Sequence, residues 1–149
     1  MVGNVFNVSY SKLSLLSIQM ATLTNVYIAN NIFYRNKFWC IVGAGLLLYK
    51  LENNTFYNQE APAIVDCHKC IYMEVNTIRV METTAPISAP FSLKPLTGIP
   101  FTLILNDVQL LNNSFSNYDF GLVFMLPQIH TLVLNGLLVQ GNCKFCSIP

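Results

Sequence analysis

The stretch from Leu105 to Phe115 reads LNDVQLLNNSF, and near-copies of it recur along the chain. With Val108 and Leu110 as the reference pair, the equivalent apolar pairs are Val26/Ile28, Tyr49/Leu51, Ile78/Val80 and Leu137/Val139. Successive pairs are separated by 23, 29, 30 and 29 residues. Repeats of about 20 to 30 residues, built from short apolar segments, are typical of solenoids, in which one repeat cannot bury a core alone.

Asparagine marks the predicted corners of this repeat. Asn-Asn pairs at 30–31, 53–54 and 112–113 are each followed two residues later by a phenylalanine, namely Phe33, Phe56 and Phe115. Because asparagine tolerates the left-handed backbone of a tight corner, each pair predicts a sharp turn between two strands. Asn76, Asn106 and Asn135 share a further register. Since an amide side chain both donates and accepts, these columns predict asparagine ladders between coils.

The pattern LxLNxVxLxNNxFxxN resembles the right-handed parallel β-helices of the pectin-lyase-like family. Residues 103–115 supply its first part and residues 33–36 supply the final FxxN. The FxxN element is also similar to repeats of bacterial polymorphic outer-membrane proteins and of large surface proteins in some protists. The resemblance covers roughly residues 20–145. It implies an all-β, right-handed parallel β-helix solenoid of about five coils, an architecture that serves lyases, adhesins and structural fibres alike.

The composition predicts a chain whose surface is covered by other protein. The 149 residues form one expected segment, 53% apolar and only 10% charged, against a usual charged share of about 25%. A net charge of +1 with scattered basic residues gives no basis for nucleic-acid binding. The longest uncharged apolar run, 38–49, is too short for a membrane span of about 20 residues. Because no polar capping segment is visible, we expect a fragment of a longer chain, or ends that neighbouring chains cover.

A proline-rich segment interrupts the repeat between residues 82 and 100. It contains Pro86, Pro90, Pro95 and Pro100. Proline cannot donate a hydrogen bond to a strand ladder. We therefore expect this segment to loop out of the stack or to run along its edge.

Five cysteines form two CxxC motifs and one isolated residue: Cys67/Cys70, Cys143/Cys146 and Cys40. The repeat register places the two motifs on different sides of their coils, with Cys143 beside Thr55 and Ser114, and about three coils apart. That separation is too large for a shared zinc ion with ligands at about 2.3 Å. We expect disulfides instead, either within each motif or, for the last two cysteines, with sequence outside the chain. No metal or cofactor is predicted, and Cys40 is expected to be a free, buried thiol.

Three sequons make Asn7, Asn53 and Asn112 candidates for N-glycosylation on a secreted surface. The corner repeat accounts equally well for Asn53 and Asn112.

Two carboxylates are the only catalytic candidates. Glu60 and Asp119 each stand four residues after a phenylalanine of the repeat, which would place them about 10 Å apart, near the range of an inverting glycosidase. Lys37 takes the same place in the first coil, so a simple surface ion pair with Glu60 is the competing prediction. We expect no catalysis, with a carbohydrate-active enzyme, a glycoside hydrolase or lyase, as the alternative.

Runs of successive apolar residues in strands force some of them outward. Such runs make Phe38, Trp39, Phe120 and Phe124 interface candidates, because exposed apolar patches mark contact surfaces. The leading hypothesis is therefore a non-catalytic structural or adhesive segment of a larger extracellular or cell-surface assembly. Its expected partners are copies of itself or neighbouring subunits. A glycan-binding module that uses Trp39 and Tyr34 is a further alternative.

Overall fold

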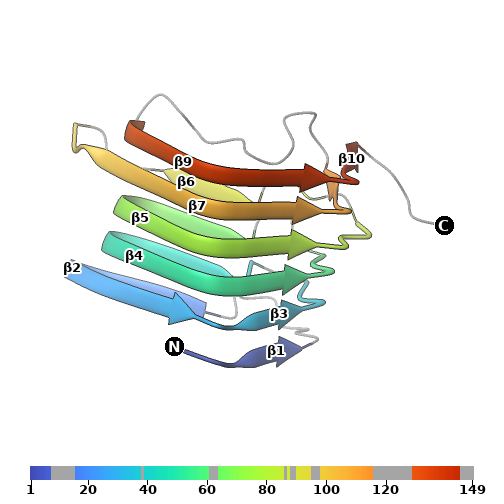
Figure 1. The fold of residues 1–149 in the computed structure, drawn as a ribbon. Coiled ribbons are helices and arrows are strands. Elements are labelled where there is room, and N and C mark those ends of the chain that lie inside the picture. The colour runs from blue at the N-terminus through green and yellow to red at the C-terminus, as the bar shows by residue number, and fades with distance from the viewer. Residues whose placement is uncertain are drawn as a thin grey trace.

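The fold is a stack of parallel strands that forms a β-solenoid of about four turns (Figure 1). The computed structural model describes residues 1–7, 16–37, 39–60, 64–85, 87, 90–94, 98–115 and 129–144. Its strands are β1 (Val5–Asn7), β2 (Leu16–Ala29), β3 (Ile32–Tyr34), β4 (Ile41–Tyr57), β5 (Val65–Met81), β6 (Phe91–Lys94), β7 (Phe101–Leu111), β8 (Ser114–Phe115), β9 (Ile129–Gln140) and β10 (Cys143–Lys144). The predicted all-β parallel solenoid is confirmed, with about four turns rather than five.

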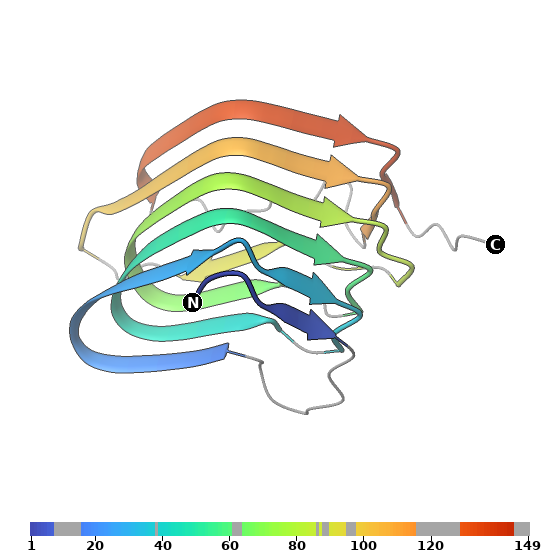
Figure 2. The same cartoon turned by 60° about the horizontal axis from the view of Figure 1, so that its bottom comes forward.

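All strand pairings are parallel, so each coil lies directly on the previous one. The main sheet has the order β1-β3-β4-β5-β7-β9, with β2 on β4 and β6 on β5, and β8 pairs with β10 in a second sheet. Figure 2 shows how β2, β4 and β5 bend around a common interior. Alternate residues of each strand point into that interior, as the burial pattern of β7 demonstrates.

Two columns of left-handed residues turn the chain at the same place in every coil. The first column contains Gly3, Asn30, Asn53, Thr77, Asp107 and Gly136. The second contains Arg35, Asn58, Glu82, Asn112 and Gly141. The expectation that asparagines occupy left-handed corners is confirmed at Asn30, Asn53 and Asn112, where φ is 56°, 48° and 53°.

The predicted repeat register is correct within each half of the stack and wrong between the halves. Val26 lies beside Tyr49, and Ile78 lies beside Val108, as predicted. Between β4 and β5, however, Tyr49 pairs with Met73, which stands five residues before the predicted Ile78. The β5, β7 and β9 coils carry two similar apolar pairs, one before and one after the first corner, whereas the first two coils carry Asn31/Phe33 and Asn54/Phe56 after it. The predicted register therefore aligned Tyr49/Leu51, which precede the corner of one coil, with Ile78/Val80, which follow the corner of the next.

The same shift corrects the predicted phenylalanine column. Phe33 and Phe56 stack with ring centroids 4.6 Å apart and an interplanar angle of 5°. The next residue in their column is Val80, whereas Phe115 lies in β8, beyond the second corner. The Asn112 corner is thus equivalent to Arg35 and not to the Asn-Asn pairs of the first two coils.

Asparagine ladders connect the coils inside and outside. Asn106 Nδ2 donates to Asn76 Oδ1 at 2.8 Å, and Asn135 Nδ2 donates to Asn106 Oδ1 at 2.9 Å, which confirms the predicted ladder. In the interior, the Asn31 backbone N–H and Nδ2 both donate to Asn54 Oδ1 at 3.1 Å. Because both residues are buried, these bonds satisfy amide groups that would otherwise be costly to bury.

Within the proline-rich segment, residues 91–94 form β6, which pairs with one strand of the main sheet and so follows its edge. β6 pairs with β5, and Phe91 and Leu93 are buried in the core. The Pro90 carbonyl accepts a hydrogen bond from the Val65 N–H at 3.2 Å. A proline just before a strand needs no donor, so it does not prevent pairing. Pro86 and Pro95 lie outside the described residues.

Two glycines of β4 lie where a Cβ would meet neighbouring atoms. Gly45 has φ 117°, and a Cβ there would meet the Met20 carbonyl oxygen. A Cβ at Gly43 would meet the hydroxyl of Tyr49, which is buried and has no hydrogen-bond partner among the described residues. Burial raises the pKa of Tyr49 to about 12, so the ring is a neutral part of the core at physiological pH.

Candidate functional site

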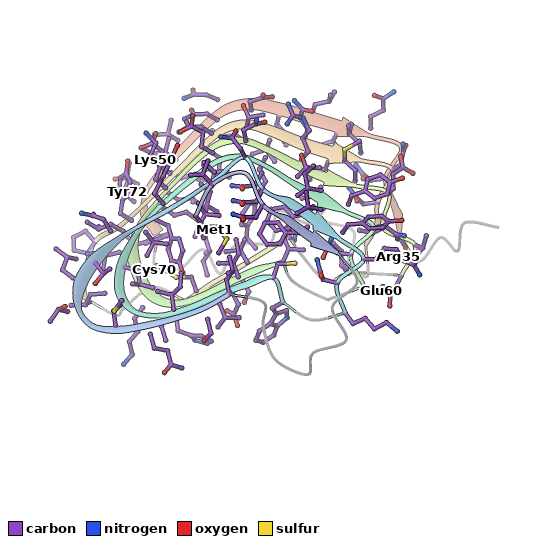
Figure 3. All side chains as sticks on the ribbon, turned by 90° about the horizontal axis from the view of Figure 1, so that it is seen from below. Met1, Arg35, Lys50, Glu60, Cys70 and Tyr72 are labelled. Carbon is purple, nitrogen blue, oxygen red and sulfur yellow. A yellow bond between two sulfur atoms is a disulfide. The ribbon has the colours of Figure 1, made fainter. Side chains whose placement is uncertain are left out.

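Glu60, the one catalytic candidate among the described residues, lies in a surface ion pair. Its Oε2 is 3.8 Å from Lys37 Nζ, and the side chains are 30% and 50% exposed. Its backbone N–H donates to the Asn36 carbonyl at 2.9 Å. Figure 3 shows Glu60 on the outside of the stack, near Arg35. Asp119 lies outside the described residues, so the pairing of these carboxylates stays a prediction.

The cysteines of the two CxxC motifs lie in different strands, Cys67 and Cys70 in β5 and Cys143 in β10. A disulfide joins Cys67 and Cys70 around the left-handed Lys69, with Cα atoms 5.9 Å apart. Cys143 pairs with Ser114, as predicted, while Cys146 lies outside the described residues. The other predicted neighbour of Cys143, Thr55, instead pairs with Arg79.

Cys40 is buried and outside any disulfide among the described residues. Its Sγ lies 3.1 Å from Gln59 Oε1, and burial raises the pKa of the thiol. Within the described ranges, no group of three or more His, Cys, Asp or Glu side chains is arranged to hold a metal ion.

Two sequon asparagines sit at exposed corners and are engaged in ladders. Asn53 Nδ2 donates to Asn30 Oδ1 at 2.9 Å. Asn112 Nδ2 donates to Glu82 Oε1 at 2.7 Å. A glycan on either amide would replace that bond. Asn7 ends β1 opposite Tyr34.

Of the predicted interface residues, only Trp39 is described, and it is partly buried. Phe38, Phe120 and Phe124 lie outside the described residues. Tyr34, proposed with Trp39 for glycan binding, packs against Tyr57 with ring centroids 5.4 Å apart.

The sequence analysis missed the largest exposed apolar feature, which is the end of the core at β9. Leu132, Leu134, Leu137 and Val139 are 46%, 45%, 41% and 38% exposed. Their neighbours in β7, namely Leu103, Leu105, Val108 and Leu110, are all 0% exposed. The four β9 residues, called here the open row, continue the core columns, and no strand of the described residues pairs with β9 on the side away from β7. The available signal was the repeat copy HTLVLNGLLVQGN, whose apolar positions match the buried positions of β7.

A second feature missed from sequence is a groove on the outer face of β2, β4 and β5, of about 560 Å³. Its rim includes Tyr27, Lys50, Tyr72 and Glu74, with Leu48 in its lining. Figure 3 shows Lys50 and Tyr72 on the outside of the stack, where Lys50 lies beside Glu74 and Tyr72 beside Leu48. Tyr72 Oη donates to Glu74 Oε2 at 2.9 Å, and Lys50 Nζ lies 3.9 Å from Glu74 Oε1.

Hydrogen bonds favour the ionised form of Glu74 and the neutral form of Tyr72 in this groove. The bond from Asn76, then the bond from Tyr72, and the nearby Lys50 hold the pKa of Glu74 below its usual range. Burial and the bond to Glu74 raise the pKa of Tyr72. The groove therefore combines an ionised carboxylate with neutral tyrosine rings at physiological pH.

Comparison with protein-family models, with curated proteins and with solved structures finds no match to this chain. The described part of the chain contains no helix that is long and apolar enough to cross a membrane.

Proposed function

We propose that the protein is a non-catalytic structural or adhesive segment of a larger extracellular or cell-surface assembly. The observation that carries this proposal is the open row. Four aliphatic side chains in the core columns are 38% to 46% exposed, although the same columns are fully buried one coil earlier. Exposed apolar surface of this kind marks a protein contact surface.

The charge distribution supports the same function. Residues 1–34 contain a single charged side chain, Lys12, and residues 120–149 contain only Lys144. The remaining charged residues lie between them, in the middle of the chain. Monomeric proteins protect sheet edges with charge, so both ends of this stack are suited to contact with protein rather than water.

A disulfide and two exposed sequons support the proposed location. The Cys67–Cys70 disulfide and the exposed sequons at Asn53 and Asn112 fit an oxidising, glycosylating compartment. The resemblance to pectin-lyase-like β-helices and to bacterial and protist surface repeats points the same way. In such a setting the protein is a glycoprotein that self-assembles or joins neighbouring subunits into a filament or coat.

A reconstruction of the protein in its native material tests this proposal. We expect protein density over the open row and over the opposite end of the stack. A solvent-exposed, isolated monomer in that material would refute the assembly role. Glu60→Ala and Asp119→Ala provide the matching test of the enzyme alternative, since a structural segment keeps its assembly behaviour in both variants.

The groove on β2, β4 and β5 favours glycan binding as a second candidate function. Tyrosine rings offer flat apolar faces for a sugar ring, while Glu74 and Lys50 offer hydrogen-bonding groups beside them. On a glycan array, we expect binding that Tyr72→Ala abolishes and Trp39→Ala leaves intact. Loss on Trp39→Ala alone would move the site to the surface suggested by sequence.

A further inference from the structure

β1 and β9 are the two ends of the strand order of the main sheet and lie at opposite ends of the stack (Figure 1), while β2 and β6, outside that order, each pair with one described strand, β4 and β5 respectively. Ile32 N–H donates to the Asn4 carbonyl at 2.9 Å, so Ile32 directs its backbone groups toward β1. Because successive residues in a strand alternate in direction, Val5 directs its N–H and C=O away from β3, to the free edge. Asn112 N–H donates to the Gln140 carbonyl at 2.8 Å. By the same alternation, the backbone groups of Val139 point away from β7.

Both edges lack the usual protection against pairing. Natural proteins place charges, prolines or bulges on exposed edge strands. Residues 1–7 and 129–142 contain no Lys, Arg, Asp, Glu or Pro. Val5 is 66% exposed on one edge, and the open row is exposed on the other. Each edge therefore presents free backbone groups beside apolar side chains.

We propose that β1 of one copy of this chain adds in parallel to β9 of a second copy. This inference rests on the proposed assembly function and names its partner and its joint. In the intramolecular stack, Thr55 N–H donates to the Asn31 carbonyl at 2.9 Å, one coil back. The equivalent bond across the joint runs from Val5 N–H to the Leu137 carbonyl of the second copy. Val139 N–H of that copy donates in turn to the Val5 carbonyl.

The side-chain columns also continue across this joint. Asn4 N–H donates to Asn31 Oδ1, and Asn31 N–H donates to Asn54 Oδ1, so each coil passes a hydrogen bond to the next. Leu137 N–H occupies the preceding place in that column and donates to Asn4 Oδ1 of the added copy. The added residues 1–7 cover Leu134, Leu137 and Val139 of the open row.

The two surfaces of this joint differ, so each added copy presents a new β1 edge or β9 edge to which a further copy can bind. An interface between unlike surfaces produces an open filament unless its rotation closes a ring. The occupant is a second copy because the β1 edge continues the same columns, in the same register and direction, that end at β9. A symmetric β9-to-β9 dimer, a different covering protein and further coils of a longer chain are the competing occupants.

Proline substitutions at the two outward-pointing residues test the joint. Val5→Pro and Val139→Pro each remove a donor that faces the free edge and leave the ladder within the chain intact. Val5→Thr and Val139→Thr, which keep the donor and the branched shape, are the matched controls. Mass is measured by sedimentation and light scattering across a concentration series, with circular dichroism to verify the fold.

We expect the wild type and both threonine controls to form oligomers that lengthen with concentration. Each proline variant alone stays a single chain. Their equimolar mixture forms a complex with twice the mass of one chain and nothing longer, because one intact β9 edge meets one intact β1 edge. If Val139→Pro lowers the thermal midpoint, Leu137→Lys replaces it, since that side chain is 41% exposed in the single copy.

Two results would overturn the proposal. If the wild type stays a single chain at every concentration, the proposed pairing of β1 with β9 between copies is refuted. Dimerisation of Val5→Pro alone would assign the contact to two β9 edges. If the joint fails while native material still shows protein over both ends, another protein is the partner and the proposed function stands.

Discussion

β7 and β9 carry similar sequences and the same fold, yet one is buried and the other is exposed. Leu105 is 0% exposed in β7, whereas its neighbour Leu134 in β9 is 45% exposed. The strands differ in that β7 has a strand on both sides and β9 on one. Burial in a solenoid thus depends on the neighbouring coil more than on the residue itself, which is why an end coil is the natural contact surface.

The largest effect that tests this comparison is expected in the phenylalanine column. Phe56 is fully buried and stacks on Phe33, so Phe56→Ala is expected to cost about 3–5 kcal/mol of unfolding free energy. Val139 ends the same column at the open edge, and Val139→Ala is expected to cost less than about 1 kcal/mol in the single copy. Denaturant unfolding at low concentration measures both. Similar costs at the two positions would contradict the difference between middle and end.

Alanine substitutions at two glycines with positive φ, Gly45 and Gly136, are expected to differ less in their cost to stability. At Gly45, alanine meets both a left-handed backbone and the Met20 carbonyl, and we expect a cost of about 2–4 kcal/mol. At Gly136, which is also left-handed, the nearest atoms to an added Cβ lie at 3.6 Å, so the cost should be about 1 kcal/mol. The thermal midpoints of the two alanine variants rank these costs. A larger loss for Gly136→Ala would be inconsistent with the close contact at Gly45.

The interior asparagine ladder separates buried from exposed amides. Asn54→Ala leaves the backbone N–H and Nδ2 of Asn31 without their acceptor, at an expected cost of about 1–3 kcal/mol. Asn53→Gly, which tolerates the left-handed corner, removes the exposed bonds to Asn30 and Arg79 next to it, and we expect about 0.5 kcal/mol or less. Equal stabilities of these variants in urea titration would refute the role assigned to burial.

The smallest predicted effect is a pH dependence in the middle of the stack. Hydrogen bonds from Asn76 and Tyr72 lower the pKa of Glu74 below its reference value of 4.5. Its contribution to stability is therefore complete above the unfolded pKa and is lost as the pH falls through the folded pKa. Between pH 7 and pH 3, the wild type should lose more stability than Glu74→Gln, by less than about 1 kcal/mol at this partly exposed site. Identical pH profiles would show that these bonds do not favour the carboxylate.

The fold class was predictable from sequence because strands appear as alternating apolar residues and left-handed corners appear as recurring asparagines. Asn30 and Asn53 identified the first corner, and Asn76 and Asn106 identified a true ladder. The register between coils was harder, because the later coils have an apolar pair on both sides of the first corner and the first two coils have one only before it. Thr77 fills that corner in the third coil without an asparagine to mark it.

The candidate site was less predictable than the fold. The open row looks the same in sequence as the buried rows, since only the absence of a covering strand distinguishes it. The groove beside Tyr72 depends on which residues neighbouring coils bring together, and Lys50 reaches Glu74 only in the shifted register. Pro90 does not prevent the following residues from pairing with β5, because a proline just before a strand does not have to donate a hydrogen bond.

Hydrogen exchange of the β9 amides tests the central claim most directly, namely that β9 is an open edge that another chain covers. In dilute protein, we predict that the Val139 amide exchanges much faster than the Leu110 amide beside it in β7. As concentration rises and oligomers form, Val139 should become protected while Leu110 changes little. Equal protection of the two amides in a dilute single chain, or no change at Val139 in the assembled protein, would contradict the account.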